Sequence, residues 1–367
     1  MKIIDIELHT VPVNRLGSWQ FVRVHTNAGW TGLGEASDSG DDALLSAALE
    51  GVKQKIVGRD PRRIEAIRQQ LQRINAGRVR QTAISAVDKA LCDIVGQAAD
   101  LPIRAFFGGA IRDRIPLYAN LNRHLVGDRG TASFAEAARE AVREGFRAVK
   151  ISPFDEVTGG GRIGSGPKAS WRPGVERVRA VREAVGEDVG LAVDCHRRFE
   201  LPEFPQVAAA LAACNLLWLE EPVPSEWTEG LREARGNAGV TLAGGETLYG
   251  MEGFAPFLQR RVVDVLMPDV KQVGGVSELH RIAEAARLER LWVAPHNASG
   301  PVGTLAAAQV MSAASRFFIL EYAWGEWDGR ATLIDPPERI ETGELVLPEG
   351  PGLGCRLNLE TGGHVGT

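Results

Sequence analysis

Cysteine is scarce in this chain, with four residues among 367 and no two of them in a C-x-x-C spacing. A disulfide framework is therefore not expected, and four free thiols indicate a reducing compartment. Long apolar runs are also missing, because no stretch approaches the roughly 18–20 residues of a membrane span. The amino terminus, MKIIDIELHT, alternates like a strand and lacks the apolar region of a signal peptide. We expect a cytoplasmic protein with no membrane partner.

Positive charge is not in excess either. Lysine and arginine number 42 against 47 aspartates and glutamates, which gives a net charge of −5 and a pI near 5.9. A nucleic-acid partner would require a basic face, so we expect none. The apolar content of 44% and the charged content of 24% are those of an ordinary globular protein.

Six short apolar runs in the later part of the chain each end in a carboxylate or a histidine. The end residues lie 26, 26, 23, 27 and 25 positions apart, a period that fits one strand plus one helix. They are Asp194, Glu220, Glu246, Asp269, His296 and Glu321. Strands buried on both faces are continuous apolar runs, and a TIM barrel takes its reacting groups from several strand tips. The pattern predicts an α/β fold, a (β/α)₈ TIM barrel with its active site at these tips.

The remaining sequence is enough for a second unit beside a barrel of roughly 250 residues. Residues 1–36 alternate like strands, whereas residues 42–100 have a helical period. We predict an α+β module over residues 1–114 and the barrel over 115–329. The tail, residues 330–367, is hairpin-like and is expected to fold back onto the first module.

Three carboxylates, Asp194, Glu220 and Glu246, end consecutive predicted strands at equal spacing. Adjacent strands lie about 4.8 Å apart, so the three could converge on one hard cation. Oxygen-only ligation favours Mg²⁺ over zinc, and without a cation clustered carboxylates repel one another. Each residue alone could equally be an ordinary strand-end carboxylate or the partner of an arginine. Their shared position on three strands favours a metal site.

Asp269 and His296 end the next two predicted strands. An aspartate that accepts a hydrogen bond from one imidazole nitrogen leaves the other nitrogen free as a base and raises its basicity. A lone histidine here would usually be a buried residue that caps a strand. The aspartate one strand earlier favours a dyad that removes a proton.

Three further groups could take part in catalysis. His196 follows Asp194 by two residues and shares its face if the strand continues, which makes it a candidate general acid or a loop histidine without a role. Lys150 could hold a carboxylate, stabilise negative charge or be solvated. Glu321, if protonated, could donate a hydrogen bond to a developing oxyanion, or it could pair with a base. Together these groups describe metal-assisted removal of the proton beside a carboxylate through an enediolate, followed by acid catalysis.

With these residues the chain resembles the mandelate racemase subgroup of the enolase superfamily over nearly its whole length. The resemblance depends on nine motifs, which are specific as a set. They are G-W-T-G-L-G-E-A at 29–36, A-I-S-A-V-D-K-A-L-C-D-I-V-G-Q at 83–97, F-F-G-G at 106–109, V-D-C-H at 193–196, L-E-E-P at 219–222, G-G-E at 244–246, M-P-D-V-K-Q-V-G-G-V-S-E at 267–278, P-H-N at 295–297 and I-L-E at 319–321.

The resemblance implies an α+β capping domain, built from the first module and the tail, over a modified barrel. It also implies Mg²⁺ on Asp194, Glu220 and Glu246, a small-molecule carboxylate substrate, and we expect a homo-oligomer. The third ligand is glutamate, which is similar to the racemases and dehydratases of the superfamily and not to the enzymes that cyclise muconate.

The motif after the second strand narrows the activity. Racemases of this type carry K-x-K on the second strand, with the second lysine as a base. This chain has Lys150-Ile151-Ser152 there, and serine cannot act as that base, so two-base racemisation is disfavoured. The D-x-H of Asp194 and His196 is similar to sugar-acid dehydratases of the galactonate and mannonate type. In those enzymes the residues matching His296 and Asp269 remove the C2 proton. The histidine matching His196 expels the 3-hydroxyl to give a 2-keto-3-deoxy acid. Such relatives often read D-x-H-G-R, and Arg197 stands here in place of the glycine.

Substrate specificity is expected in loops that the barrel does not fix. The long loop 153–173 is rich in glycine and is expected to order on substrate. The candidate substrate-binding residues, each of which could instead be an ordinary surface residue, are Arg15, Trp19, Asn120, Asn122, Arg162 and Trp324.

Three functions remain open at this point. The first is a Mg²⁺-dependent sugar-acid dehydratase, a lyase acting on an aldonate or aldarate. The second is a racemase or epimerase of an α-hydroxy or other carboxylate, which requires a second base from Lys150 or His196. The third is a non-catalytic barrel, a metal-binding or regulatory relative that has lost its activity, which the complete set of ligands, dyad and acid disfavours.

Overall fold

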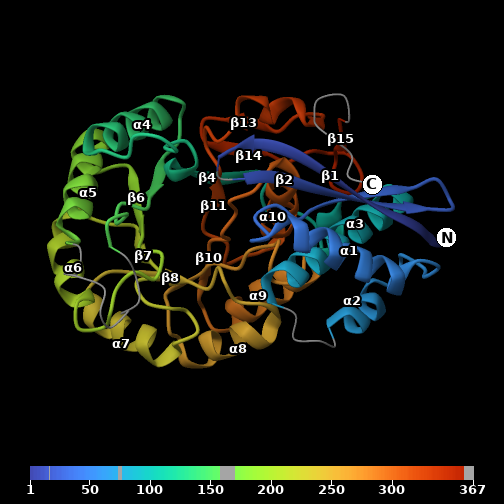
Figure 1. Cartoon of the computed structure of the whole chain (residues 1–367), viewed down its shortest axis with the longest axis horizontal. Helices are drawn as coiled ribbons and strands as arrows, with labels where there is room; N and C mark the ends of the chain where they lie inside the picture. The colour runs from blue at the N-terminus through green and yellow to red at the C-terminus, as the bar shows by residue number, and fades with distance from the viewer. Residues whose placement is uncertain (16, 73–76, 158–169, 359–367) are drawn as a thin grey trace.

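The computed structural model describes residues 1–15, 17–72, 77–157 and 170–358. A closed ring of strands, surrounded by helices, forms one side of the molecule, and an α+β unit lies beside it (Figure 1). The predicted fold class, a modified TIM barrel with a capping domain, is confirmed.

Eight parallel strands of the described chain form the barrel. They are β4 (Arg114–Asn120), β5 (Ala148–Ile151), β6 (Gly190–Asp194), β7 (Trp218–Glu220), β8 (Leu242–Gly244), β9 (Val265–Leu266), β10 (Trp292–Val293) and β11 (Leu320–Tyr322). Each strand pairs with the next in chain order up to β10, and β11 pairs with β4. A single bridge from Val293 to Phe317, just before β11, joins the last two strands and closes the ring.

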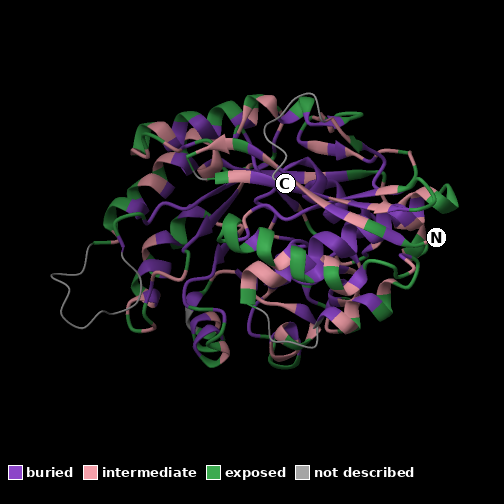
Figure 2. Ribbon diagram, turned by 45° about the vertical axis from the view of Figure 1, so that its right-hand side comes forward, coloured by how far each residue is buried: buried purple, intermediate pink, exposed green. Residues whose placement is uncertain are grey.

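Seven α-helices connect the barrel strands and cover the outside of the ring. They are α4 (Thr131–Arg143), α5 (Arg172–Val185), α6 (Phe204–Leu211), α7 (Thr228–Ala238), α8 (Gly250–Arg260), α9 (Val276–Leu288) and α10 (Pro301–Ala313). After β11 the described chain has only a 3₁₀ turn, Asp328–Thr332, where an eighth helix would stand in an unmodified barrel. The mostly apolar strands lie at the centre, and burial follows the inner faces of the helices (Figure 2).

Three barrel strands end earlier than the sequence predicted. Glu246 lies two residues beyond the end of β8. Asp269 lies three residues beyond the end of β9, and His296 lies three residues beyond the end of β10. Pro268 and Pro295 supply the reason for the last two, because proline has no N–H to donate to the strand ladder. The catalytic candidates of these strands therefore lie on the turns that follow them.

The amino-terminal unit consists of an antiparallel sheet with helices packed on it. The strands are β1 (Ile3–Asn14), β2 (Gly17–Thr26) and β3 (Thr31–Glu35), and the helices are α1 (Asp42–Ile56), α2 (Ile64–Gln72) and α3 (Gly77–Ala99). Strand β3 crosses α3 at close range, since a Cβ atom added at Gly34 would lie 2.0 Å from the carbonyl oxygen of Ala86. The glycines of the G-W-T-G-L-G-E-A motif thus permit backbone contact between sheet and helix.

The tail connects the two units. Strand β14 (Glu344–Val346) pairs with β13 (Arg339–Glu341) and adds an antiparallel edge to the barrel strand β4. Further on, the N–H of Gly352 donates to Leu101 O at 2.9 Å, and the N–H of Leu353 donates to the Asp93 carboxylate of α3 at 2.8 Å. The tail therefore contacts both units. The exact domain limits stay a prediction. No helix among the described residues is long and apolar enough to cross a membrane.

The close approach of β3 and α3 gives a stability prediction. We expect Gly34→Ala to lower the free energy of unfolding by about 3 kcal/mol, because the new methyl group collides with backbone that cannot move alone. Urea denaturation followed by circular dichroism measures the change. The matched control is Gly51→Ala in α1, where an added Cβ meets nothing within 4 Å. There we expect no loss, or a gain of up to about 1 kcal/mol from helix propensity. Equal effects at the two sites would contradict the packing argument.

Candidate active site

A cavity of about 440 Å³ lies between the carboxyl ends of the barrel strands and the capping domain. The cap contributes Asp38 and Arg78 to its wall, and the barrel contributes the rest. Several of the predicted residues line it together: Asn120, Asn122, Lys150, Asp194, His196, Glu246 and His296. The fold thus brings the sequence candidates from seven different positions to one chamber.

Three carboxylates converge at this cavity. One oxygen each of Asp194, Glu220 and Glu246 lies within 4.8 Å of the others. Asp194 and Glu220 are paired neighbours in the register of β6 and β7, which explains their proximity. The Ser152 hydroxyl donates to Asp194 at 3.2 Å, and the Trp218 indole N–H donates to Glu220 at 3.2 Å. The cluster could hold a metal ion through oxygen donors alone.

The electrostatics of the cluster favour a cation. Burial raises the pKa of Glu220 to about 8, with Asp194 and Glu246 adding to the effect and Lys150 opposing it. Burial and the neighbouring carboxylates also raise the pKa of Glu246 to about 6, against the influence of His296. Carboxylates that repel one another in this way would be stabilised as anions by a divalent ion, so the residues present fit a metal.

His296 and Asp269 form the predicted pair. The imidazole Nδ1 lies 2.7 Å from Asp269 Oδ2, and Nε2 lies 3.4 Å from the Glu246 carboxylate. Burial opposes the charged imidazole, but Glu246, Glu321 and Asp269 outweigh it and raise the pKa of His296 to about 10. The Asp269 carboxylate fixes Nδ1 as a hydrogen-bond donor, so Nε2 is the nitrogen that faces the cluster of Asp194, Glu220 and Glu246.

His196 reaches the same cavity by a route that the sequence did not predict. Strand β6 ends at Asp194, and His196 and Arg197 have left-handed backbones with φ of 46° and 59°. The strand therefore does not continue to His196, which was the condition for a shared face, but the turn still brings the imidazole Nε2 to 2.6 Å from Asp194. The negative charge of Asp194 raises the pKa of His196 to about 9, so the imidazole is protonated at neutral pH.

Lys150 and Glu321 form a buried ion pair, so the Lys150 ammonium is not solvated. Lys150 Nζ lies 3.0 Å from both the Glu220 and the Glu321 carboxylates, and its side chain is 1% exposed. Burial opposes the Glu321 anion, but Lys150 and His296 outweigh it and lower the pKa of Glu321 to about 2. Glu321 also accepts hydrogen bonds from Asn120 Nδ2 and the Asn297 N–H. Of the two roles left open for Glu321, these contacts agree with pairing to a base.

The candidate substrate residues divide into two groups. Asn120 and Asn122 line the cavity, with Asn122 Nδ2 donating to Asn120 Oδ1 at 2.8 Å. Arg15 is exposed, and Trp324 is directed elsewhere, since its indole N–H donates to Glu144 at 2.7 Å.

Trp19 lines a neighbouring cavity of about 320 Å³ and packs edge-on against Trp327. Arg162 lies outside the described residues. So does the rest of the segment 158–169, which belongs to the loop 153–173 predicted to order on substrate.

The sequence reasoning missed several residues of the site. Arg129 donates to the Ser152 carbonyl at 2.7 Å and pairs with Asp155, and both side chains line the cavity. Lys271, wholly buried, contacts Asp269 at 3.0 Å. Arg129 stands in a polar loop with no signal of its own, whereas Lys271 stands two residues after a catalytic candidate, which was a usable signal.

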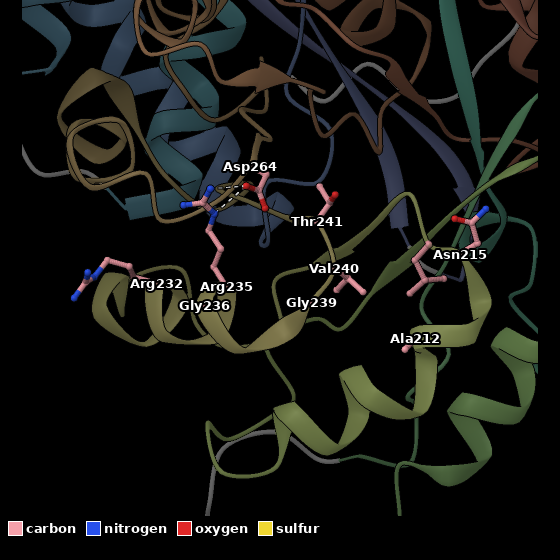
Figure 3. A pocket seen from close by; sticks show the side chains of 10 residues that line it. Ala212, Asn215, Arg232, Arg235, Gly236, Gly239, Val240, Thr241 and Asp264 are labelled. Carbon is pink, nitrogen blue, oxygen red and sulfur yellow. Dashed lines mark hydrogen bonds and ion pairs between the residues drawn. The ribbon is translucent and has the colours of Figure 1, made fainter.

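A second and larger hollow, of about 680 Å³, lies at the opposite end of the barrel (Figure 3). Thr241 and Asp264 on its wall directly precede β8 and β9, so they mark the amino ends of these strands. The ion pair between Arg235 and Asp264, at 2.7 Å, lies on its wall, and none of the predicted catalytic residues lines it. Size alone therefore does not locate the chemistry.

The fold and the cavity together define a capped barrel with a carboxylate cluster and two histidines at its strand tips. Residues 4–108 match the family described as mandelate racemase / muconate lactonizing enzyme, N-terminal domain. Residues 133–361 match the family described as enolase C-terminal domain-like. The chain belongs to the enolase superfamily, in the mandelate racemase and muconate lactonizing enzyme family.

Named relatives are similar to the chain over nearly its whole length. A D-xylonate dehydratase of Haloferax volcanii is 33% identical, covering 98% of this chain and 87% of the relative. A D-galactonate dehydratase of Variovorax paradoxus is 30% identical, covering 98% and 93%. Among solved structures, a mandelate racemase/muconate lactonizing enzyme-like protein of Rubrobacter xylanophilus is 34% identical with a TM-score of 0.89, covering 98% and 96%.

Proposed function

We propose that this chain is a Mg²⁺-dependent sugar-acid dehydratase, a hydro-lyase that removes the C2 proton and the 3-hydroxyl of an aldonate or aldarate. The observation that carries the proposal is that two histidines, each held by a different aspartate, lie beside one cluster of carboxylates. His296 is held by Asp269, and His196 is held by Asp194. The names of the relatives, dehydratases of xylonate, gluconate and galactonate, support the same substrate class.

Asp194, Glu220 and Glu246 would hold the metal. When bound there, Mg²⁺ supplies positive charge to the substrate carboxylate and so makes the neighbouring C–H more acidic. Lys150, fixed between Glu220 and Glu321, adds a permanent positive charge to the same wall. This charge is useful where negative charge develops on the substrate during proton removal.

The two histidines suit opposite proton transfers. Nε2 of His296 takes the C2 proton, because Asp269 occupies Nδ1 and stabilises the imidazolium that forms. Glu246 is among the carboxylates that raise the pKa of this imidazole, and a cation on the cluster would offset that charge and favour the neutral imidazole that a base requires. His196, whose Nε2 lies 2.6 Å from Asp194, gives its proton to the departing 3-hydroxyl, which leaves as water. Electrons from the C2–H bond form the C2–C3 double bond as the C3–O bond breaks. Rearrangement of the enol product gives the 2-keto-3-deoxy acid.

A racemase is the less favoured alternative. Two-base racemisation requires a neutral base on the second face of the substrate. Lys150 does not suit this role, since the carboxylates of Glu220 and Glu321 raise its pKa well above the ordinary value despite its burial. Ser152, at the position of the second lysine of K-x-K, donates to Asp194 and has no basic nitrogen.

A screen of mono- and diacid sugars with millimolar Mg²⁺ tests the proposal. We expect one or a few acids to yield a 2-keto acid, detected as its semicarbazone, and EDTA to abolish the reaction. Deuterium entering C2 from D₂O with no loss of water from any acid would instead favour the racemase. No turnover and no exchange on any acid in the screen would overturn the proposal.

A further inference from the structure

The Asp269 carboxylate has a second partner besides His296. Lys271 Nζ lies 3.0 Å from Asp269 Oδ2, the same oxygen that His296 Nδ1 contacts at 2.7 Å. The backbone N–H of Lys271 donates to the other oxygen, Oδ1, at 2.7 Å. The side chains of Asp269 and Lys271 are both 0% exposed. One lysine thus binds both oxygens of the carboxylate that orients the base.

Lys271 also reaches the segment that follows the histidine. Its ammonium donates to the Ala298 carbonyl at 3.2 Å and to the Ser299 hydroxyl at 2.8 Å. It therefore ties the turn after β9, which carries Asp269, to the turn after β10, which carries His296. Asp269 and His296 both lie beyond the paired residues of their strands, so side-chain contacts of this kind help to fix the distance between the two turns.

We propose that Lys271 is a positioning residue for the reaction, whose ammonium holds the Asp269 carboxylate and the 298–299 segment so that His296 Nε2 faces the carboxylate cluster. The inference rests on the proposed function, in which His296 is the base. Without the ammonium, Asp269 would be a buried anion with one fewer donor, and its carboxylate would be free to rotate or to take up a proton. Either change removes the acceptor that fixes Nδ1 of His296 as a donor.

A neighbouring lysine separates this role from simple charge balance. Lys89, on α3 of the capping domain, is also 0% exposed, and its Nζ donates to the Val270 carbonyl at 3.3 Å, between Asp269 and Lys271 in the chain. It belongs to the same buried charged cluster, yet no hydrogen bond joins it to Asp269 among the described residues. Lys89→Met therefore removes an equally buried charge and leaves the contacts of the carboxylate intact.

The test compares Lys271→Met with Lys89→Met. For Lys271→Met we expect kcat for C2 deuterium exchange to fall at least about 30-fold with KM changed less than about twofold, because substrate binding is untouched and the base is misplaced. For Lys89→Met we expect kcat within about threefold of the wild type. Asp269→Asn and the double variant Asp269→Asn/Lys271→Met should have equal kcat values, because Lys271 acts through Asp269.

A second readout does not depend on turnover. A hydrogen bond between Nδ1–H and a carboxylate gives a low-field proton resonance, which the His296→Asn variant assigns. We expect Lys271→Met to lose this resonance and Lys89→Met to keep it. If the wild type acts on no acid, the proposed function fails, and the resonance alone then decides the role of Lys271.

Several outcomes would overturn the inference. Lys271→Met with the kcat and the resonance of the wild type is one, and kcat losses that multiply in the double variant are another. If Lys271→Met does not fold, Ser299→Ala replaces it, because it removes one anchor of the ammonium and keeps every charge. We then expect kcat about 3- to 10-fold lower, and an unchanged kcat would contradict the proposal.

Discussion

The Glu220→Gln variant should lose both metal binding and turnover. Glu220 is fully buried at the centre of the cluster, and its two oxygens face Lys150 and the indole of Trp218. The neutral amide oxygen is a weaker ligand for Mg²⁺ than a carboxylate oxygen, and the change leaves Lys150 with one carboxylate partner fewer. We expect Mg²⁺ affinity to fall more than about 100-fold, since even outer-shell changes cost 10- to 100-fold. Turnover should fall at least about 1,000-fold. Isothermal titration with Mg²⁺ and the 2-keto acid assay measure the two effects.

The adjacent residue provides the control. Glu221 is equally buried but is not one of the three clustered carboxylates, and it accepts from the Ser225 hydroxyl and from the N–H of Gly245, which precedes Glu246. Glu221→Gln makes the same chemical change one position later, and we expect Mg²⁺ affinity to fall only about 10-fold, the size of an outer-shell change. Tight Mg²⁺ binding by Glu220→Gln, with an effect at Glu221 instead, would mean that the metal lies elsewhere.

The periodicity of the sequence predicted the barrel because it depends on burial, which repeats with every strand and helix. Asp194, Glu220 and Glu246 could be recognised in the same way, because packing of the apolar core does not require a carboxylate at the end of a buried strand. Details that depend on the turns could not be predicted. The left-handed backbone at His196 arises from a local conformation without a periodic signal, whereas Pro295 was a local signal for the early end of β10.

Side-chain partners were the second kind of information that the sequence withheld. A lysine at a strand tip is usually solvated, and nothing local to Lys150 reveals that Glu321, 171 positions away, closes an ion pair over it. Lys271 is similar, because its contact with Ser299 depends on how two turns meet. The partners of such residues are found only once the strands are placed in space. This is why the candidate metal ligands could be named from the sequence and the contacts that support them could not.

The two active-site histidines should separate the two halves of the reaction. His296→Asn should abolish C2 proton exchange, with a loss of about 100- to 10,000-fold, because among the described residues no other base lies on that wall of the proposed site. His196→Asn should keep exchange and lose dehydration, because exchange requires only the base. Proton NMR in D₂O follows both at once, through loss of the C2 proton signal and growth of the 2-keto-3-deoxy acid.

His280→Asn is the control for this pair of variants. His280 stacks on Phe107 at a ring distance of 4.2 Å, on helix α9 outside the cavity, and both rates should stay within about twofold of the wild type. The outcome at His196 also tells whether the steps are separate. If His196→Asn stops exchange together with dehydration, proton removal and hydroxide departure are concerted, or His196 binds the substrate. If both active-site variants dehydrate at the full rate, the assignment of base and acid is wrong, although the metal site could still stand. The two histidines, held by different carboxylates beside one cluster, thus make the order of proton transfers accessible to experiment.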